Sequence, residues 1–281
     1  MDYHSERFED HSVLVFKGDA LVAVCPAHRE NKELRSHWGL TYGGVLWDPN
    51  LNDTELDSIF QLFKGYLREQ GFMKFYIKEI PSIYLQPDAF TMNRKLYGQA
   101  YIAHTERVLA VDYSKPFQIH KTKLKHYRRG KRLGFEINCT TDFSSFWKEV
   151  LSPRLASRHK VKPVHSLEEI TLLAKRFPEE IKQYNIQLNG EILAGITLFD
   201  KGSVVKSQYG ATTDLGETYR ALEFLFIELI KDYKTQGKRF FSMGTVGDQR
   251  FPEGFNPGLK RQKEELGCIE FQQHFYTFDL K

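Results

Sequence analysis

The sequence predicts an α/β protein made of two similar domains in tandem, each with a mixed, mostly antiparallel sheet flanked by helices. Its 281 residues exceed one ordinary small domain and fit two domains of about 130–150 residues. The same order of elements occurs in both halves: a hairpin, a long helix, a glycine and a strand. We therefore expect one domain over residues 1–120 and a second over residues 121–281.

A short alignment supports an internal repeat. Residues 60–75 and 226–241 match at four positions, which pair Phe60 with Phe226, Gln70 with Gln236, Gly71 with Gly237 and Phe75 with Phe241. All four fall at corresponding places in the same order of elements, which makes a duplicated unit the better explanation of the match.

The first half begins with strand signals. Residues 12–27 are two apolar runs around a Lys-Gly-Asp turn, which predicts a β-hairpin. Residues 52–71 start with Asp53 and Thr54 as an Asp/Thr cap, continue with apolar residues at helical spacing and end at a glycine. Residues 72–81 then read as a strand that ends at a proline.

The second half repeats this order. The pair Asn189-Gly190 predicts the turn of a hairpin over residues 184–200. Ser166, followed by two glutamates, predicts the start of a helix in the region between the halves. The remaining elements expected are helices over 141–156, 165–181 and 218–237 and strands over 204–212 and 238–246.

Composition excludes several classes of function. The chain is 41% hydrophobic and 27% charged with a net charge of +4, as in a globular protein with a real core. The three cysteines, Cys25, Cys139 and Cys268, have no metal-ligand spacing, and we expect reduced, buried thiols and no metal. The polar start of the chain (1–12) and the lack of a long apolar run predict a cytoplasmic protein without stable membrane insertion. No phosphate-binding loop, dinucleotide fingerprint or GxSxG nucleophile is present, which leaves group transfer or binding.

Residues 121–134 carry seven Lys or Arg residues and no acid. One interpretation is the solvated face of a linker helix. The other is an anion site, because a solvated face usually interleaves acids with bases. We expect apolar side chains to anchor the segment while Lys123, Arg128, Arg129 and Arg132 face outward or into a cleft.

Three further stretches are candidate sites. Asn256 is expected to cap a helix that carries Lys263, where positive charge suits an anion or oxyanion; composition alone favours an ordinary charged surface helix. The segment SHWGLTYGG contains His37, which titrates near neutral pH, and glycines that allow close backbone approach; a tight turn is the alternative. The strand KSQYGAT places Gln208 and Tyr209 where a ligand or a core network supplies partners.

The order of motifs resembles a known family. SHWGLTYGG, YIKEIPSIY, KHYRRGKR, PVHSLEEITLLAKRFP, SQYGAT, ALEFLFIELI and NPGLKRQKEELG resemble the FemAB-like or BioF2-like acyltransferases, a bacterial branch of the GNAT superfamily often encoded beside surface-polysaccharide genes. The resemblance covers nearly the whole chain and implies two tandem GNAT-like domains. In Fem-type enzymes a Phe-Lys pair lies at the transfer site, and the matching positions here are Gln262 and Lys263.

The resemblance implies an N-acyltransferase that moves an acyl or aminoacyl group to an amine, such as an amino sugar or a cell-envelope precursor. The resemblance offers two donors, acyl-CoA and charged tRNA. Residues 208–222 lack the glycine-rich pyrophosphate loop of ordinary GNAT enzymes, which counts against CoA, and no helical coiled-coil arm is evident, which counts against tRNA. We expect Lys263 to stabilise the oxyanion and His37 or Tyr209 to act as base or relay. The substrate-binding positions expected are Tyr42, Lys78, Arg128, Arg129, Arg132, His165, Gln208 and Asn256.

A different class of function stays open at this stage. The same scaffold fits a non-catalytic binding module that holds a nucleotide-linked sugar or RNA, because a fold does not determine a function. Turnover with an acyl donor distinguishes the enzyme from RNA binding that has a steep salt dependence and no turnover.

Overall fold

The computed structural model describes residues 6–98 and 100–281 and divides them into two compact units. Unit 1 comprises the chain up to Arg107 together with Phe271–Lys281, and unit 2 comprises Val108–Glu270. This division differs from the one expected from the sequence, 1–120 and 121–281, because the last strand of the chain lies in unit 1. The first five residues of the polar start of the chain lie outside the described residues.

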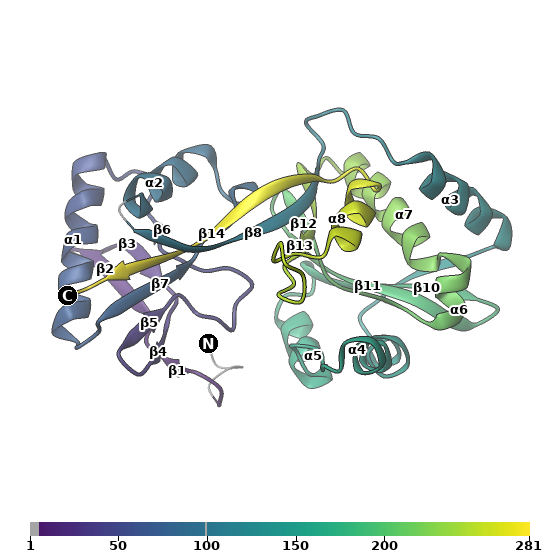
Figure 1. Ribbon diagram of the computed structural model, residues 1–281, viewed down its shortest axis with the longest axis horizontal. Helices are drawn as coiled ribbons and strands as arrows, with labels where there is room; N and C mark the ends of the chain where they lie inside the picture. Colours follow the sequence, from purple (N-terminus) through teal and green to yellow (C-terminus); the bar gives the residue numbers. More distant parts are fainter. Residues whose placement is uncertain (1–5, 99) are drawn as a thin grey trace. The chain divides into compact units, whose positions relative to one another are not determined.

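Unit 1 is built on a sheet in the order β1-β4-β5-β7-β14-β8 (Figure 1). β5 and β7 run parallel, with Leu34 opposite Phe75, whereas β4 with β5 and β7 with β14 are antiparallel. The bounds of these strands are β1 Glu9–Asp10, β4 His28–Glu30, β5 Glu33–Arg35, β7 Lys74–Lys78, β8 Tyr101–Asp112 and β14 Ile269–Asp279.

A second, smaller sheet and two α-helices complete unit 1. The small sheet has the order β2-β3-β6, and a short 3-10 helix, η2, follows β7. The bounds are β2 Val13–Lys17, β3 Ala20–Cys25, β6 Leu46–Trp47, α1 Asp53–Glu69, η2 Ser82–Tyr84 and α2 Pro87–Tyr97. Phe60 and Phe63 of α1 pack with Phe75 of β7 and Phe278 of β14 in the core of the unit.

Unit 2 has a sheet in the order β8-β13-β12-β11-β10-β9, in which β12 and β13 are parallel. Figure 1 shows α7 and α8 on one side of this sheet and α4 and α5 on the other. The bounds are α3 Lys121–Leu133, β9 Glu136–Thr140, a π-helix Phe146–Leu151, α4 Ser152–His159, α5 Leu167–Arg176, β10 Ile181–Leu188, β11 Glu191–Lys201, β12 Val204–Thr212, α6 Asp214–Tyr219, α7 Ala221–Thr235, β13 Phe240–Thr245 and α8 Pro257–Glu264.

The two units share a repeated motif, as the alignment predicts. At the end of α1, the backbone N–H of Gln70 donates to Tyr66 and that of Phe72 to Leu67; at the end of α7, Gln236 donates to Asp232 and Lys238 to Tyr233. Gly71 and Gly237 have φ angles of 80° and 77°, in the left-handed region that glycine tolerates best. Each helix therefore ends in the same way and leads into a buried strand of its unit.

Several local expectations need correction. The helix expected over 218–237 is interrupted by Arg220, whose φ of 61° separates α6 from α7. The cap of α1 is Asn52, which forms a capping box with Glu55, and not the Asp/Thr pair that follows it. Cys139 is exposed rather than buried, because β9 is the edge strand of its sheet. The predicted turn at Asn189-Gly190 and the predicted cap at Ser166 are confirmed.

Candidate functional site

The two parallel strands of unit 2 pair over a short length only. Val204–Lys206 of β12 lie opposite Phe240–Ser242 of β13, and beyond these residues β12 continues to Thr212 paired with β11. Among the described residues, the second edge of β12 has no neighbouring strand from Ser207 onward. Such an edge presents backbone N–H and C=O groups to which an extended ligand can hydrogen-bond.

Lys263 of α8 holds the end of β13. Its Nζ donates to the carbonyl oxygens of Met243, at 2.6 Å, and Thr245, at 2.8 Å, and its residue is only 6% exposed. Gly244 O lies farther away, at 3.4 Å. Burial lowers the pKa of Lys263 to about 8, because a charged ammonium loses its hydration there. Buried groups with perturbed pKa values are common at functional sites, so Lys263 marks the end of β13, where the two strands diverge, as part of the candidate site.

The start of α8 explains how Lys263 is positioned. The Asn256 side chain accepts the backbone N–H of Leu259 at 2.9 Å, and Pro257 occupies the first turn, where its missing N–H costs nothing. The predicted cap at Asn256 is confirmed. Because its side-chain oxygen is used by the helix, its role in substrate binding stays a prediction.

Tyr209 lies on the unpaired part of β12 and bonds to His165. The Tyr209 hydroxyl accepts the backbone N–H of His165 at 3.1 Å and lies 2.6 Å from its Nδ1. The hydroxyl oxygen thus accepts the backbone N–H and also lies within hydrogen-bond distance of Nδ1, where either group is the donor according to the histidine tautomer. Burial raises the pKa of Tyr209, so the phenol stays protonated near neutral pH.

Trp147 fixes this pair. Its Nε1 donates to the His165 carbonyl at 3.3 Å, and its ring meets the Tyr209 ring edge-on at 5.2 Å. The neighbouring Gln208 accepts a hydrogen bond from Lys206 on the same strand. Tyr209 and His165 are thus held in one orientation by a buried indole, a role for Trp147 that the sequence analysis did not identify.

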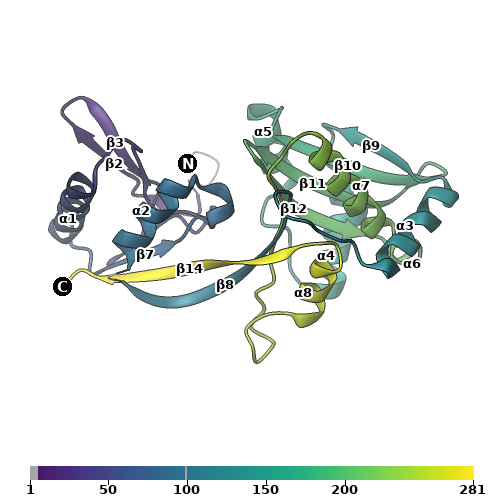
Figure 2. The same ribbon diagram turned by 90° about the horizontal axis from the view of Figure 1, so that it is seen from above.

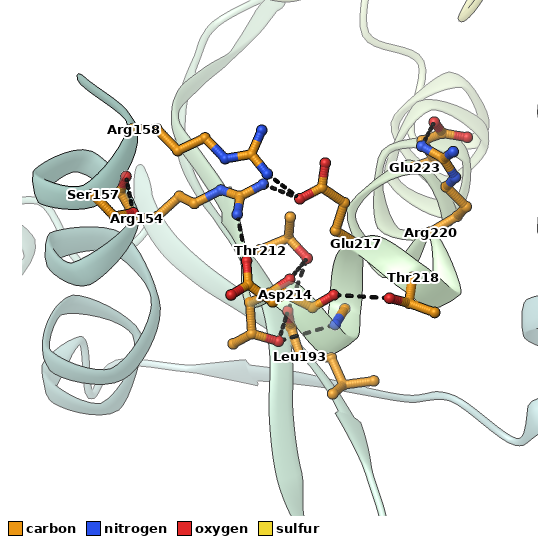
Figure 3. A network of polar contacts seen from close by, with 12 residues as sticks. Arg154, Ser157, Arg158, Leu193, Thr212, Asp214, Glu217, Thr218, Arg220 and Glu223 are labelled. Atoms are coloured by element: carbon orange, nitrogen blue, oxygen red, sulfur yellow. Dashed lines mark hydrogen bonds and ion pairs between the residues drawn. The ribbon is translucent and has the colours of Figure 1, made fainter.

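The segment after β12 is organised by carboxylates and arginines (Figure 3). Arg154 Nη1 lies 2.9 Å from Asp214 Oδ1, and Arg154 and Arg158 both contact Glu217. These arginines were not among the residues predicted from the sequence, although two Arg residues four positions apart on one predicted helix are a recognisable signal. The acids in the first turn of α6, Asp214 and Glu217, are paired with arginines of α4, so these residues do not form a cradle for a pyrophosphate.

The turn itself is tightly packed. Thr213 caps α6 by accepting the Gly216 N–H at 3.0 Å, and the Thr212 hydroxyl donates to the Leu193 carbonyl at 3.0 Å (Figure 3). A Cβ atom at Gly216 would lie 2.1 Å from Leu193 O, so only glycine fits there. This packing fixes the path of the chain where β12 ends.

The basic helix expected near the middle of the chain is α3. Arg128, Arg129 and Arg132 are exposed, as predicted. Lys123 is not: it is buried, with its Nζ 2.8 Å from Glu223 Oε1 and 3.5 Å from Glu265 Oε2. The expectation that Lys123 faces outward is wrong, because α7 and the end of α8 supply carboxylates to the inner side of α3.

The remaining predicted residues lie in unit 1. His37 is 0% exposed, with its ring 4.9 Å from Phe8 and 5.3 Å from His28. The Tyr42 ring lies tilted against the Tyr84 ring, with 4.6 Å between their centres, and burial lowers the pKa of Lys78. Unit 2 therefore contains Lys263, Tyr209, His165, Gln208, Asn256 and the three arginines, whereas unit 1 contains His37, Tyr42 and Lys78.

The parallel strands of unit 1 are closed where those of unit 2 diverge. Directly after β5, the Ser36 N–H donates to Tyr76 O at 2.8 Å and the Ser36 hydroxyl accepts the Lys78 N–H at 2.9 Å. Gly43 N–H then donates to Lys78 O at 2.8 Å. A Cβ atom at Gly43 would lie 2.6 Å from Ser36 O, so this glycine serves close packing within the segment.

Among the residues that the structure describes, no group of three His, Cys, Asp or Glu side chains is arranged to hold a metal ion. No helix in this part of the chain is both long and apolar enough to cross a membrane.

Comparison with known proteins identifies the fold. FemX superposes with a TM-score of 0.70 over 99% of this chain and 90% of its own, at 10% identity. The fold is that of FemX. The L-PGS of Bacillus licheniformis follows with a TM-score of 0.64 at 14% identity, covering 94% of this chain and 83% of its own.

The C-terminal domain of a putative lysylphosphatidylglycerol synthetase from Agrobacterium fabrum has a TM-score of 0.63 at 13% identity, over 96% of this chain and 84% of its own. No protein-family model and no curated sequence matches the chain. At these identities the likeness to FemX concerns the fold. At that level it confirms the resemblance and the two-domain α/β fold class expected from the sequence.

Proposed function

We propose that this FemX-like protein is an N-acyltransferase that moves an acyl or aminoacyl group from an activated donor to an amine, such as an amino sugar or a cell-envelope precursor. The divergence of β12 from β13 carries the proposal, because it frees one edge of β12 beside Tyr209 and exposes the end of β13 held by Lys263. Unit 1 closes the corresponding edge with its own backbone, so we place the donor in unit 2.

The proposed reaction is direct transfer. The amine nitrogen attacks the acyl carbonyl carbon, the C–N bond forms, the bond to the leaving group breaks, and the amine proton ends on the leaving group. Tyr209 relays this proton, since its hydroxyl can exchange a proton with His165 Nδ1 at 2.6 Å. His37 was the alternative base, and its full burial makes Tyr209 the better candidate.

Lys263 is proposed to stabilise the oxyanion that forms during attack. An ammonium has three N–H donors, and two of them make the short bonds to Met243 O and Thr245 O. The third faces only the longer contact with Gly244 O, so it is the donor available to a developing negative charge. Tyr42, Lys78, Gln208, Asn256 and the exposed arginines of α3 stay predicted substrate contacts.

The donor remains the open choice between acyl-CoA and charged tRNA. The start of α6 carries Asp214 and Glu217 with their arginine partners rather than a glycine-rich cradle, so the residues there do not fit a CoA pyrophosphate. The steps of the transfer are the same for either activating group.

The test is transfer with purified protein. Acetyl-CoA, longer acyl-CoAs and aminoacyl-tRNA are each incubated with a panel of amino sugars and peptidoglycan-type amines, and acylated products are detected by mass spectrometry. We expect Tyr209→Phe to lower kcat by about a hundredfold or more, because it removes the relayed proton but keeps the ring against Trp147. An unchanged kcat would remove Tyr209 from the mechanism. Failure of every pair, together with RNA binding, would favour the binding module instead.

A further inference from the structure

The basic residues of α3 form two sets, and the inner set contacts carboxylates of its own unit. Besides Lys123, His126 Nδ1 lies 3.0 Å from Glu223 Oε2 and Lys131 Nζ lies 2.5 Å from Glu228 Oε1. The acids come from α7, which packs along α3. These contacts account for the basic residues on the side of α3 that faces the protein.

The outer set has no such partners. Every exposed residue of α3 is Lys or Arg except Thr122. Of these exposed cations, five have no carboxylate oxygen within 4.0 Å among the described residues: Lys121, Lys125, Arg128, Arg129 and Arg132. The Arg129 guanidinium lies 5.7 Å from the centre of the Tyr219 ring. We call these five residues the outer cationic face.

Helical spacing places the outer cationic face on one side of α3. Positions 121, 125, 128 and 132 follow the i, i+4, i+7, i+11 pattern, and position 129 lies beside them. The stripe extends for about 16 Å, because each residue rises about 1.5 Å along the helix. It is therefore a straight row of positive charge and not a scatter of surface lysines.

Packing fixes the direction in which this row points. The Tyr127 ring stacks on Phe224 at 5.2 Å, and a Cβ atom at Gly130 would lie 2.5 Å from Phe224, so α3 sits tightly on α7. Figures 1 and 2 both show α3 beside α7 at the outside of unit 2. The outer cationic face is thus held at the outside of that unit, and its first residue, Lys121, lines a hollow between the start of α3 and the end of α8.

A straight row of cations at the outside of a unit restricts the class of partner. Proteins that track single-stranded nucleic acid use a groove with aromatic side chains on which bases stack, and the aromatic ring of α3, Tyr127, is packed on Phe224. An A-form RNA duplex has a major groove too narrow for side chains to read, and its convex surface meets a convex helix over a short length. A flat anionic surface can meet the whole row at once.

We propose that the outer cationic face of α3 docks the protein on the surface of an anionic lipid bilayer. The attraction is electrostatic and leaves the helix outside the hydrocarbon, because no apolar side chain is exposed on α3. Juxtaposed charges of this kind lose most of their attraction beyond a Debye length, so binding should weaken as salt increases.

The experiment measures vesicle binding and needs no turnover, so it is independent of the proposed function. Purified protein is sedimented with vesicles of phosphatidylcholine alone or with 30 mol% phosphatidylglycerol, about a third anionic lipid. The test variant carries K121Q, K125Q, R128Q and R132Q. The matched control carries K32Q, R68Q, K162Q and K175Q, four exposed cations that lie outside α3. Both variants lower the net charge by the same amount.

We expect the wild type and the control to bind the anionic vesicles and not the neutral ones. The affinity of the test variant for anionic vesicles should be lower by roughly a hundredfold or more. Each Lys or Arg near the membrane surface raises the affinity by a factor of several. Equal binding by the test variant and the wild type would overturn the proposal. So would an absence of vesicle binding, or an equal loss in the control. Binding of duplex RNA or DNA in place of vesicles would assign the face to nucleic acid and also overturn it.

Discussion

Lys263 gives the prediction with the clearest magnitude. Its Nζ is buried and donates to Met243 O and Thr245 O, and burial lowers its pKa from 10.5 to about 8. A shift of this size corresponds to about 3 kcal/mol, at about 1.4 kcal/mol for each pKa unit. At neutral pH the Lys263 amine is charged, and its charged form is more stable in the unfolded chain, where it is hydrated, than in the folded protein.

The direction of the pH dependence follows from the two pKa values. Below pH 8 the lysine is charged in both states, and the full penalty is present. Between pH 8 and 10.5 the unfolded chain binds this proton and the folded protein does not, so the free energy of unfolding rises with pH. Lys263→Met keeps an unbranched side chain of similar length but removes the titrating amine, so this variant should lack the rise in the free energy of unfolding.

The assay is urea unfolding at several pH values between 7 and 10.5. Wild type, Lys263→Met and the exposed control Lys162→Met are compared, and other titrations cancel because all three proteins share them. The free energy of unfolding of the wild type minus that of Lys263→Met should increase by about 3 kcal/mol from pH 7 to 10.5. A difference that stays constant with pH would refute the reasoning and show that the carbonyl bonds keep the ammonium charged.

The remaining predictions concern packing. Phe278→Ala should lower the free energy of unfolding by about 3–5 kcal/mol, because the ring packs 5.2 Å from Phe60 in the core of unit 1; Leu62→Ala, at a side chain 72% exposed on α1, is the control. A loss as small as the control's would place β14 outside that core. Gly65→Ala and Gly130→Ala both remove a glycine from a helix. A Cβ atom at Gly65 has open space, so Gly65→Ala should raise the free energy of unfolding in urea by about 1 kcal/mol. A Cβ atom at Gly130 meets Phe224, so the free energy of unfolding of Gly130→Ala should be about 2 kcal/mol lower than that of Gly65→Ala. Equal effects would show that α3 is not held tightly against α7.

Short-range features of this protein could be predicted from its sequence. The hairpin turn at Asn189-Gly190, the cap at Ser166 and the cap at Asn256 all appear in the structure. Each depends on contacts between residues at most three positions apart, so the residue types alone carry the information. The repeat between α1 and α7 was readable for the same reason, since their ends use the same local hydrogen bonds.

Long-range features of unit 1 could not be read in this way. The last strand of the chain pairs with β7, with Phe278 opposite Phe75, although about two hundred residues separate them. No periodicity in the sequence indicates which strand completes which sheet. The division of the chain into units therefore differs from the one expected, which followed sequence order.

The candidate site shows the same limit. The sequence by itself determined which residues can ionise, donate or cap, and it placed Lys263, Tyr209 and the basic segment of α3 among the candidates. Only the tertiary structure decided that Lys263 holds the end of β13, that Tyr209 bonds to His165, and that Lys123 faces inward. The physical reason is that each of these roles depends on a partner from another element, and burial against that partner sets the charge, the orientation and the pKa.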